Sequence, residues 1–119
     1  MPTSLIINTQ FAALHQWNTI PDDHTQHYLK HPHRHMFHIT LRIPVKHHDR
    51  DLEFIEIKNM LDDWLRATFP NRALANTPSI GSMSCEMLAD KIKSDFSVYS
   101  IHPTYVCVME DGENGAEVY

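Results

Sequence analysis

The chain has 119 residues, 42% of them hydrophobic, and a formal net charge of −5, which suits one domain with a modest core. The sequence has no Lys/Arg run that would indicate nucleic-acid binding, no apolar run as long as a membrane span, and no features of a signal peptide. Because Cys85 and Cys107 form no disulfide framework or zinc-finger spacing, we expect reduced thiols and a cytoplasmic protein.

Two strands are predicted in the first part of the chain. Residues 4–15 and 33–45 alternate between two kinds of side chain with the period of two that is typical of strands. The odd positions of the second strand are apolar after an initial pair of histidines, and its even positions are polar, including His38, Thr40 and Arg42. Residues 16–32 between the strands are polar and contain two prolines. They predict a long loop, of a length that is usually functional or mobile.

Two helices are predicted in the second half. After a charged turn, residues 52–69 repeat apolar side chains at the spacing of an amphipathic helix. Residues 70–82 contain two prolines and several small polar residues, and they predict a connection. A second helix is expected over residues 84–96, with Ser82 or Ser84 as its N-cap.

The end of the chain predicts two further strands. Residues 104–110 and 116–119 flank a glycine-containing turn at residues 111–115. The predicted order is therefore β-β-α-α-β-β. This order corresponds to the α+β class, with an antiparallel sheet that carries two helices on one face.

Three of the ten histidines suggest a metal site. His33 and His35 stand two residues apart at the start of a strand, so their imidazoles point to the same face. His15, at the end of the other long strand, supplies a third nitrogen. Three protein nitrogens with an open fourth position are typical of a catalytic zinc. The alternative is that all three are ordinary surface or hydrogen-bonded histidines.

Five short segments, spread over nearly the whole chain, form an ordered set of motifs. They are residues 11–15 (FAALH), 33–37 (HRHMF), 52–58 (LEFIEIK), 84–89 (SCEMLA) and 106–110 (VCVME). In this order they resemble the F-x-A-A-H, H-G-H-N-Y, V-x-D-F-x-x-L-K, T-S-E-x-L-A and V-x-V-x-E-T motifs of the 6-pyruvoyltetrahydropterin and 6-carboxytetrahydropterin synthase family. Each match is weak alone, and the five in order are fairly specific.

The resemblance implies a fold, a cofactor and a substrate. Family members have the T-fold and assemble as hexamers of stacked trimers around a barrel. By resemblance, His15, His33 and His35 would bind Zn²⁺, Glu110 would anchor a pterin ring, and Ser84 would contact the pterin from a neighbouring subunit. The implied substrate is 7,8-dihydroneopterin triphosphate or a related pterin, and the implied pathway is the biosynthesis of queuosine or another deazaguanine.

The chain departs from the family where protons are transferred. Leu29 stands at the position of the catalytic cysteine, and Pro70 and Asn71 replace the Asp-His pair. Proton transfer by a side chain typically contributes about 10²–10⁴-fold to a rate, so its loss bears directly on activity. The catalytic residue therefore stays open. His27 or His31 is a candidate replacement base, because histidine titrates near neutral pH and the loop leads into the metal site.

Three functions are compatible with this pattern. The first is a zinc-dependent pterin enzyme with a relocated proton shuttle. The second is a degenerate T-fold protein that binds a pterin or purine, or assembles, without turnover. The third is an enzyme of altered chemistry, such as an aldolase-type cleavage or a hydrolysis at zinc.

Overall fold

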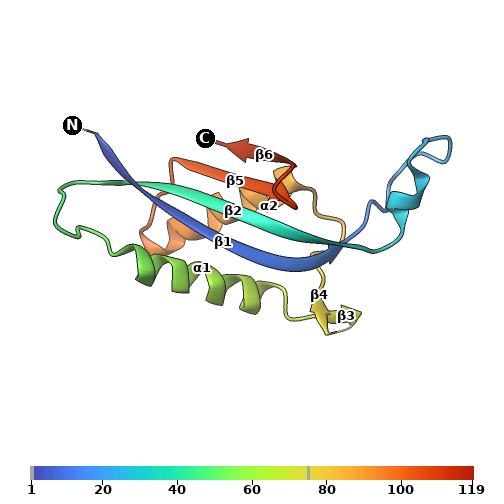
Figure 1. Ribbon diagram of the computed structural model, residues 1–119, viewed down its shortest axis with the longest axis horizontal. Coiled ribbons are helices and arrows are strands. Elements are labelled where there is room, and N and C mark those ends of the chain that lie inside the picture. Colours follow the sequence, from blue (N-terminus) through green and yellow to red (C-terminus); the bar gives the residue numbers. More distant parts are fainter. Residues whose placement is uncertain (1, 75) are drawn as a thin grey trace.

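The computed structural model describes residues 2–74 and 76–119 (Figure 1). These residues form two long strands, two helices and four shorter strands, together with two short 3₁₀ helices. In chain order these elements are β1 (Thr3–His15), η1 (His27–Lys30), β2 (His33–Val45), α1 (Phe54–Thr68), β3 (Arg72–Leu74), β4 (Thr77–Pro78), α2 (Cys85–Phe96), η2 (Ser97–Tyr99), β5 (Tyr105–Glu110) and β6 (Asn114–Val118).

The main sheet is antiparallel, with the strand order β1-β2-β5-β6 (Figure 1). β1 and β2 pair without interruption along their whole length, from Thr3 opposite Val45 to His15 opposite His33. β5 then pairs with β2 so that Glu110 lies opposite Phe37. This register brings the ends of three strands together at one end of the sheet.

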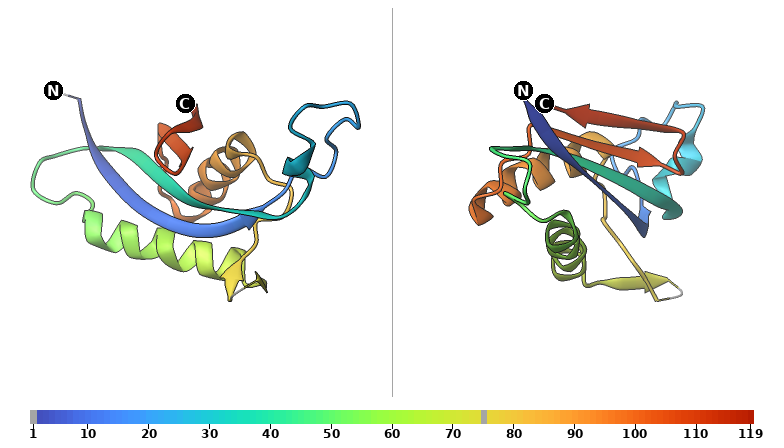
Figure 2. Two further views of the ribbon diagram at one scale, coloured as in Figure 1. Left: turned by 45° about the vertical axis from the view of Figure 1, so that its right-hand side comes forward. Right: turned by 60° about the vertical axis from the view of Figure 1, so that its left-hand side comes forward.

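The core lies between one face of this sheet and the two helices (Figure 2). The odd positions of β2 from Phe37 to Ile43 are fully buried, as the alternation predicts. α1 and α2 contribute their apolar faces to the same core, and the ring of Trp64 lies 6.2 Å from that of Phe96. The predicted α+β class, with two helices on one face of an antiparallel sheet, is confirmed. The opposite face mixes exposed or half-buried polar side chains with apolar ones such as Ile6 and Met36.

Both helices begin at a side-chain cap. Glu53 accepts a hydrogen bond from the Glu56 amide at the start of α1, and Ser84 accepts one from the Met87 amide at the start of α2. Each cap satisfies one of the amides that a first helical turn leaves without a partner. Neither helix is long and apolar enough, in the part of the chain described, to cross a membrane.

Three sequence expectations need correction. The connection at residues 70–82 contains the β3–β4 hairpin, and the loop at residues 16–32 contains η1, because elements of two to four residues are too short to show a period. The last strand begins at Asn114 and not at residue 116. Asp111 and Gly112 both have left-handed φ angles, +55° and +71°, and they complete the turn early.

Candidate metal centre

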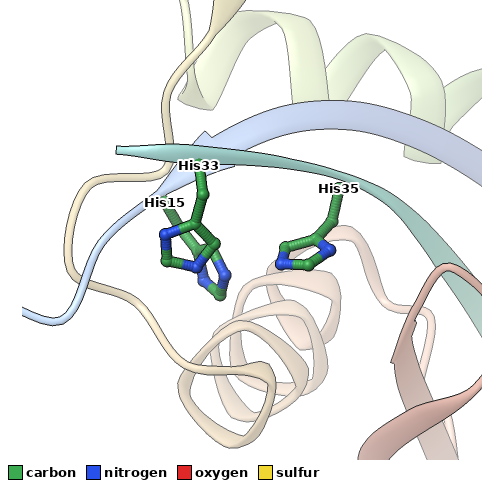
Figure 3. A group of neighbouring side chains, drawn as sticks. All are labelled: His15, His33 and His35. Atoms are coloured by element: carbon green, nitrogen blue, oxygen red, sulfur yellow. The ribbon is translucent and has the colours of Figure 1, made fainter. Parts of the chain in front are cut away.

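The three predicted histidines lie together at the end of the β1–β2 pair. Their candidate ligand atoms all lie within 4.8 Å of one another. Figure 3 shows the three imidazoles on the same side of the two strands. His15 faces His33 in register, with ring centroids 4.4 Å apart, and His35 follows on the same face of β2, 5.2 Å from each. The alternation of β2 therefore places the His-x-His pair as the sequence predicts.

Each imidazole is oriented by a bond at its Nδ1 atom. The acceptors are the Met83 carbonyl for His15 at 3.2 Å, the His31 carbonyl for His33 at 2.8 Å, and the Asp111 carboxylate for His35 at 2.6 Å. A carbonyl or an ionised carboxylate can only accept, so Nδ1 carries the proton in each ring. In the neutral imidazole, Nε2 then has a free lone pair. Such outer hydrogen bonds are the usual companions of metal-binding histidines.

His15 is the most buried of the three. It is 9% exposed, and its Nε2 has no hydrogen-bond partner among the described residues. Burial lowers the pKa of His15 below its usual 6.5, so the ring is neutral near pH 7. A buried acceptor without a donor is costly in free energy, and a bound cation would satisfy it. The donor set therefore fits a Zn²⁺ ion, which favours imidazole nitrogen.

A carboxylate and a thiol lie beside the histidines. Glu110, at the end of β5, has Oε1 at 3.3 Å from His15 Nε2 and Oε2 at 3.6 Å from His35 Nε2. Cys85 donates a weak hydrogen bond to Glu110 Oε1 at 3.8 Å. Burial, and then the charge of Glu110, raise the pKa of Cys85 to about 12, so the thiol stays protonated. Sequence reasoning missed Cys85, although it lies inside the matched segment 84–89.

Asp111 is a second residue that sequence reasoning did not select. Its Oδ1 accepts the Met36 amide at 2.9 Å while Oδ2 accepts His35 Nδ1 at 2.6 Å. These two bonds, the one from His35 first, lower the pKa of Asp111. The sequence marks Asp111 only as a turn residue, because its contact with His35 depends on the pairing of β5 with β2.

A cavity of about 1130 Å³ opens over the histidines. Its lining combines the metal-site residues with side chains of the 16–32 loop and the start of α2. Among them are His15, His33, His35, Glu110, Cys85, Ser84, Glu86, Trp17, Tyr28 and Leu29. A volume above the usual 300–1,000 Å³ of ligand pockets leaves room for a bicyclic ring with a substituent.

No known family profile and no curated protein matches the chain. Among solved structures, the fold is similar to that of an uncharacterized protein from Wolinella succinogenes. That similarity has a TM-score of 0.62, covers 100% of this chain and 98% of the other, and is accompanied by 11% sequence identity. At this identity the likeness shows the fold alone.

The two candidate bases of the loop lie outside the cavity lining. Within the described residues, η1 contributes Tyr28 and Leu29 to the lining, and neither His27 nor His31 is part of it. His27 Nε2 lies 3.9 Å from the Asp22 carboxylate, and His31 contributes its backbone carbonyl to His33. In this arrangement His31 orients His33 through its main chain.

The lowered pKa of His15 predicts a pH dependence of the metal-free protein. In the unfolded chain His15 binds a proton near pH 6.5, whereas in the folded chain it binds one only at a lower pH. Protonation of His15 therefore favours the unfolded chain. The stability that depends on neutral His15 is complete above pH 6.5 and is lost as the pH falls. We expect the free energy of unfolding, measured by urea titration with a chelator present, to decrease below that pH. The same series on His15→Gln should be flatter, and equal slopes would contradict the assignment.

Removal of the Asp111 charge should weaken metal binding. Asp111→Asn keeps a side chain that tolerates the left-handed backbone but loses the ionised acceptor that orients His35. We expect zinc affinity, measured by competition with a chromophoric chelator, to fall by about 10–100-fold, as is typical for outer-shell partners. Glu113→Gln, which removes an exposed charge from the same turn, is the control. Equal affinities in the two variants would exclude the orienting role.

Proposed function

We propose that the protein is a zinc-dependent enzyme that acts on 7,8-dihydroneopterin triphosphate or a related pterin, in the manner of 6-carboxytetrahydropterin synthase. The observation that carries the proposal is the convergence of His15, His33 and His35, each oriented through Nδ1, beside a cavity large enough for a pterin. A bound zinc would supply Lewis-acid polarisation of a substrate oxygen. The proposed biological context is the biosynthesis of queuosine or another deazaguanine.

The proposed substrate contacts come from residues that line this cavity. An ionised Glu110 can accept paired hydrogen bonds from the ring NH and the exocyclic amino group of a pterin. Trp17 and Tyr28 present aromatic surface on which a flat ring can stack. Ser84 lines the cavity of its own chain, whereas the resemblance implied a contact from a neighbouring subunit. It uses its hydroxyl oxygen to cap α2, and its O–H remains able to donate to a ligand.

Assembly into a homo-oligomer, with a hexamer as the expected form, is part of the proposal. β1 and β6 are the edge strands of the main sheet. Within the described residues, the outer edge of β1 forms one β-bridge, between Leu14 and Ser79. Long open edges of this kind are usually covered in native proteins. Pairing between subunits would cover them.

A degenerate T-fold protein without turnover is the second candidate. Leu29, at the position of the family's catalytic cysteine, lines the cavity. An aliphatic side chain there cannot transfer a proton. This observation favours a protein that binds a pterin or purine and releases it unchanged.

Turnover by the zinc-loaded protein decides between the two candidates. The protein would be incubated with 7,8-dihydroneopterin triphosphate, and products would be identified by chromatography and mass. Formation of 6-carboxytetrahydropterin or another defined pterin, which is lost in His33→Ala and kept in His38→Ala, would support the enzyme. Full zinc occupancy and measurable pterin binding without any product would support the second candidate.

A further inference from the structure

Four acceptor groups converge at the metal centre. The Nδ1 bonds of His15, His33 and His35 end on carbonyl or carboxylate oxygens, so in the neutral rings each Nε2 presents a lone pair. The Glu110 carboxylate, which also only accepts, faces two of these nitrogens. Acceptors that face one another without a donor repel, and a cation between them reverses the sign of that interaction. The electrostatics of the site therefore involve Glu110 as well as the three histidines.

Two of the separations between these acceptors are of the size found between ligands of one metal ion. Around a tetrahedral zinc with bonds of about 2.0–2.2 Å, neighbouring ligand atoms lie roughly 3.3–3.6 Å apart. Glu110 Oε1 lies 3.3 Å from His15 Nε2, and Oε2 lies 3.6 Å from His35 Nε2. In the neutral rings these contacts are not hydrogen bonds, because each Nδ1 carries the one ring proton. Glu110 is not one of the three residues whose ligand atoms all lie within 4.8 Å of one another, and each of its oxygens approaches a different nitrogen. It therefore lies beside the metal position, where a small rotation of its side chain would bring one oxygen to the place of a fourth ligand.

We propose that Glu110 is the fourth ligand of the metal in the substrate-free protein, and that an incoming ligand must displace it. The proposal rests on the metal centre of the proposed function and adds a closed resting state to it. The Cys85 S–H donates to Oε1 from the start of α2 and so helps to hold the carboxylate near the histidines. Displacement would release the carboxylate into the cavity, where it can accept hydrogen bonds from the ligand ring.

The test uses the Co²⁺-substituted full-length protein without substrate. Visible absorption reports the ligand set of cobalt, and competition with a chelator reports its affinity. Glu110→Gln removes the carboxylate with little change in shape. Glu86→Gln is the matched control, because it removes an equal charge from the lining of the same cavity without a contact to the histidines among those described. His33→Ala tests the three-histidine centre itself. Thiocyanate serves as a probe of an open metal position.

In Glu110→Gln we expect cobalt affinity to fall by about 100-fold, the upper end of the range for outer-shell partners, because a direct ligand is lost. Its spectrum should change, and thiocyanate should bind to it more tightly than to the wild type. Glu86→Gln should match the wild type in all three respects. If Glu110→Gln has wild-type affinity and a wild-type spectrum while His33→Ala loses binding, the proposal that Glu110 is the fourth ligand is wrong. The proposed function would still stand. Unchanged binding in His33→Ala would contradict both.

Discussion

Replacement of His35 by alanine is expected to lower zinc affinity by more than about 100-fold, because loss of an outer-shell partner alone costs about 10–100-fold and His35 would be a direct ligand. Zinc should also cease to stabilise the fold. A ligand at 100 times its Kd stabilises the folded state by about 2.7 kcal/mol, so the wild type should unfold at a higher temperature with zinc, and His35→Ala should not. Chelator competition and thermal unfolding measure the two effects.

His38→Ala is the matched control for this prediction. His38 lies on the same strand as His35 but on its opposite face, opposite Met109 of β5. Loss of its imidazole should leave zinc affinity near the wild-type value. If the two variants lose zinc equally, the site does not depend on the face of β2, and the three-histidine centre is wrong.

Replacement of Phe96 by alanine is expected to destabilise the protein by about 3–5 kcal/mol, the usual cost when a buried phenylalanine is truncated. Phe96 is fully buried at the end of α2, and its ring lies 6.2 Å from Trp64 and 5.9 Å from Tyr99. Truncation leaves a cavity between α2 and α1 and removes both aromatic contacts. Because whole domains are stable by only about 5–15 kcal/mol, the loss should be plain in urea unfolding of the metal-free protein.

The control for the core prediction is Ile92→Val, one turn earlier on the same helix. Ile92 is also fully buried, but this change removes one methyl group and should cost about 0.5–1.5 kcal/mol. A loss in Phe96→Ala no larger than that in Ile92→Val would mean that the junction of the helices is not part of a close-packed core.

The elements of the main sheet and both helices could be predicted because each repeats its pattern over several residues. The thirteen residues of β2 show the period of two, and the fifteen of α1 show the period of the helix. β3 and β4, with three and two residues, show neither period. The early start of β6 also escaped prediction, because Asn114 and Gly115 are typical turn residues that here pair with β5.

The cluster of three histidines could be predicted from spacing, whereas its surroundings could not. His33 and His35 share a face by strand geometry alone, and register places His15 beside them. The bonds that orient His15 and His35 involve Met83 and Asp111, which lie 68 and 76 residues away along the chain from the histidines they hold. Contacts over such separations depend on how the sheet and α2 pack together, and no local pattern records them.

The left-handed backbone of Asp111 has a consequence for how this protein would respond to selection for stability. A non-glycine residue at φ +55° costs about 1 kcal/mol relative to glycine, which adopts this conformation freely. Glycine at position 111 would remove this cost, but it would also remove the carboxylate that accepts hydrogen bonds from His35 and from the Met36 amide. Selection for stability therefore acts on the backbone and on the side chain of this residue in opposite directions.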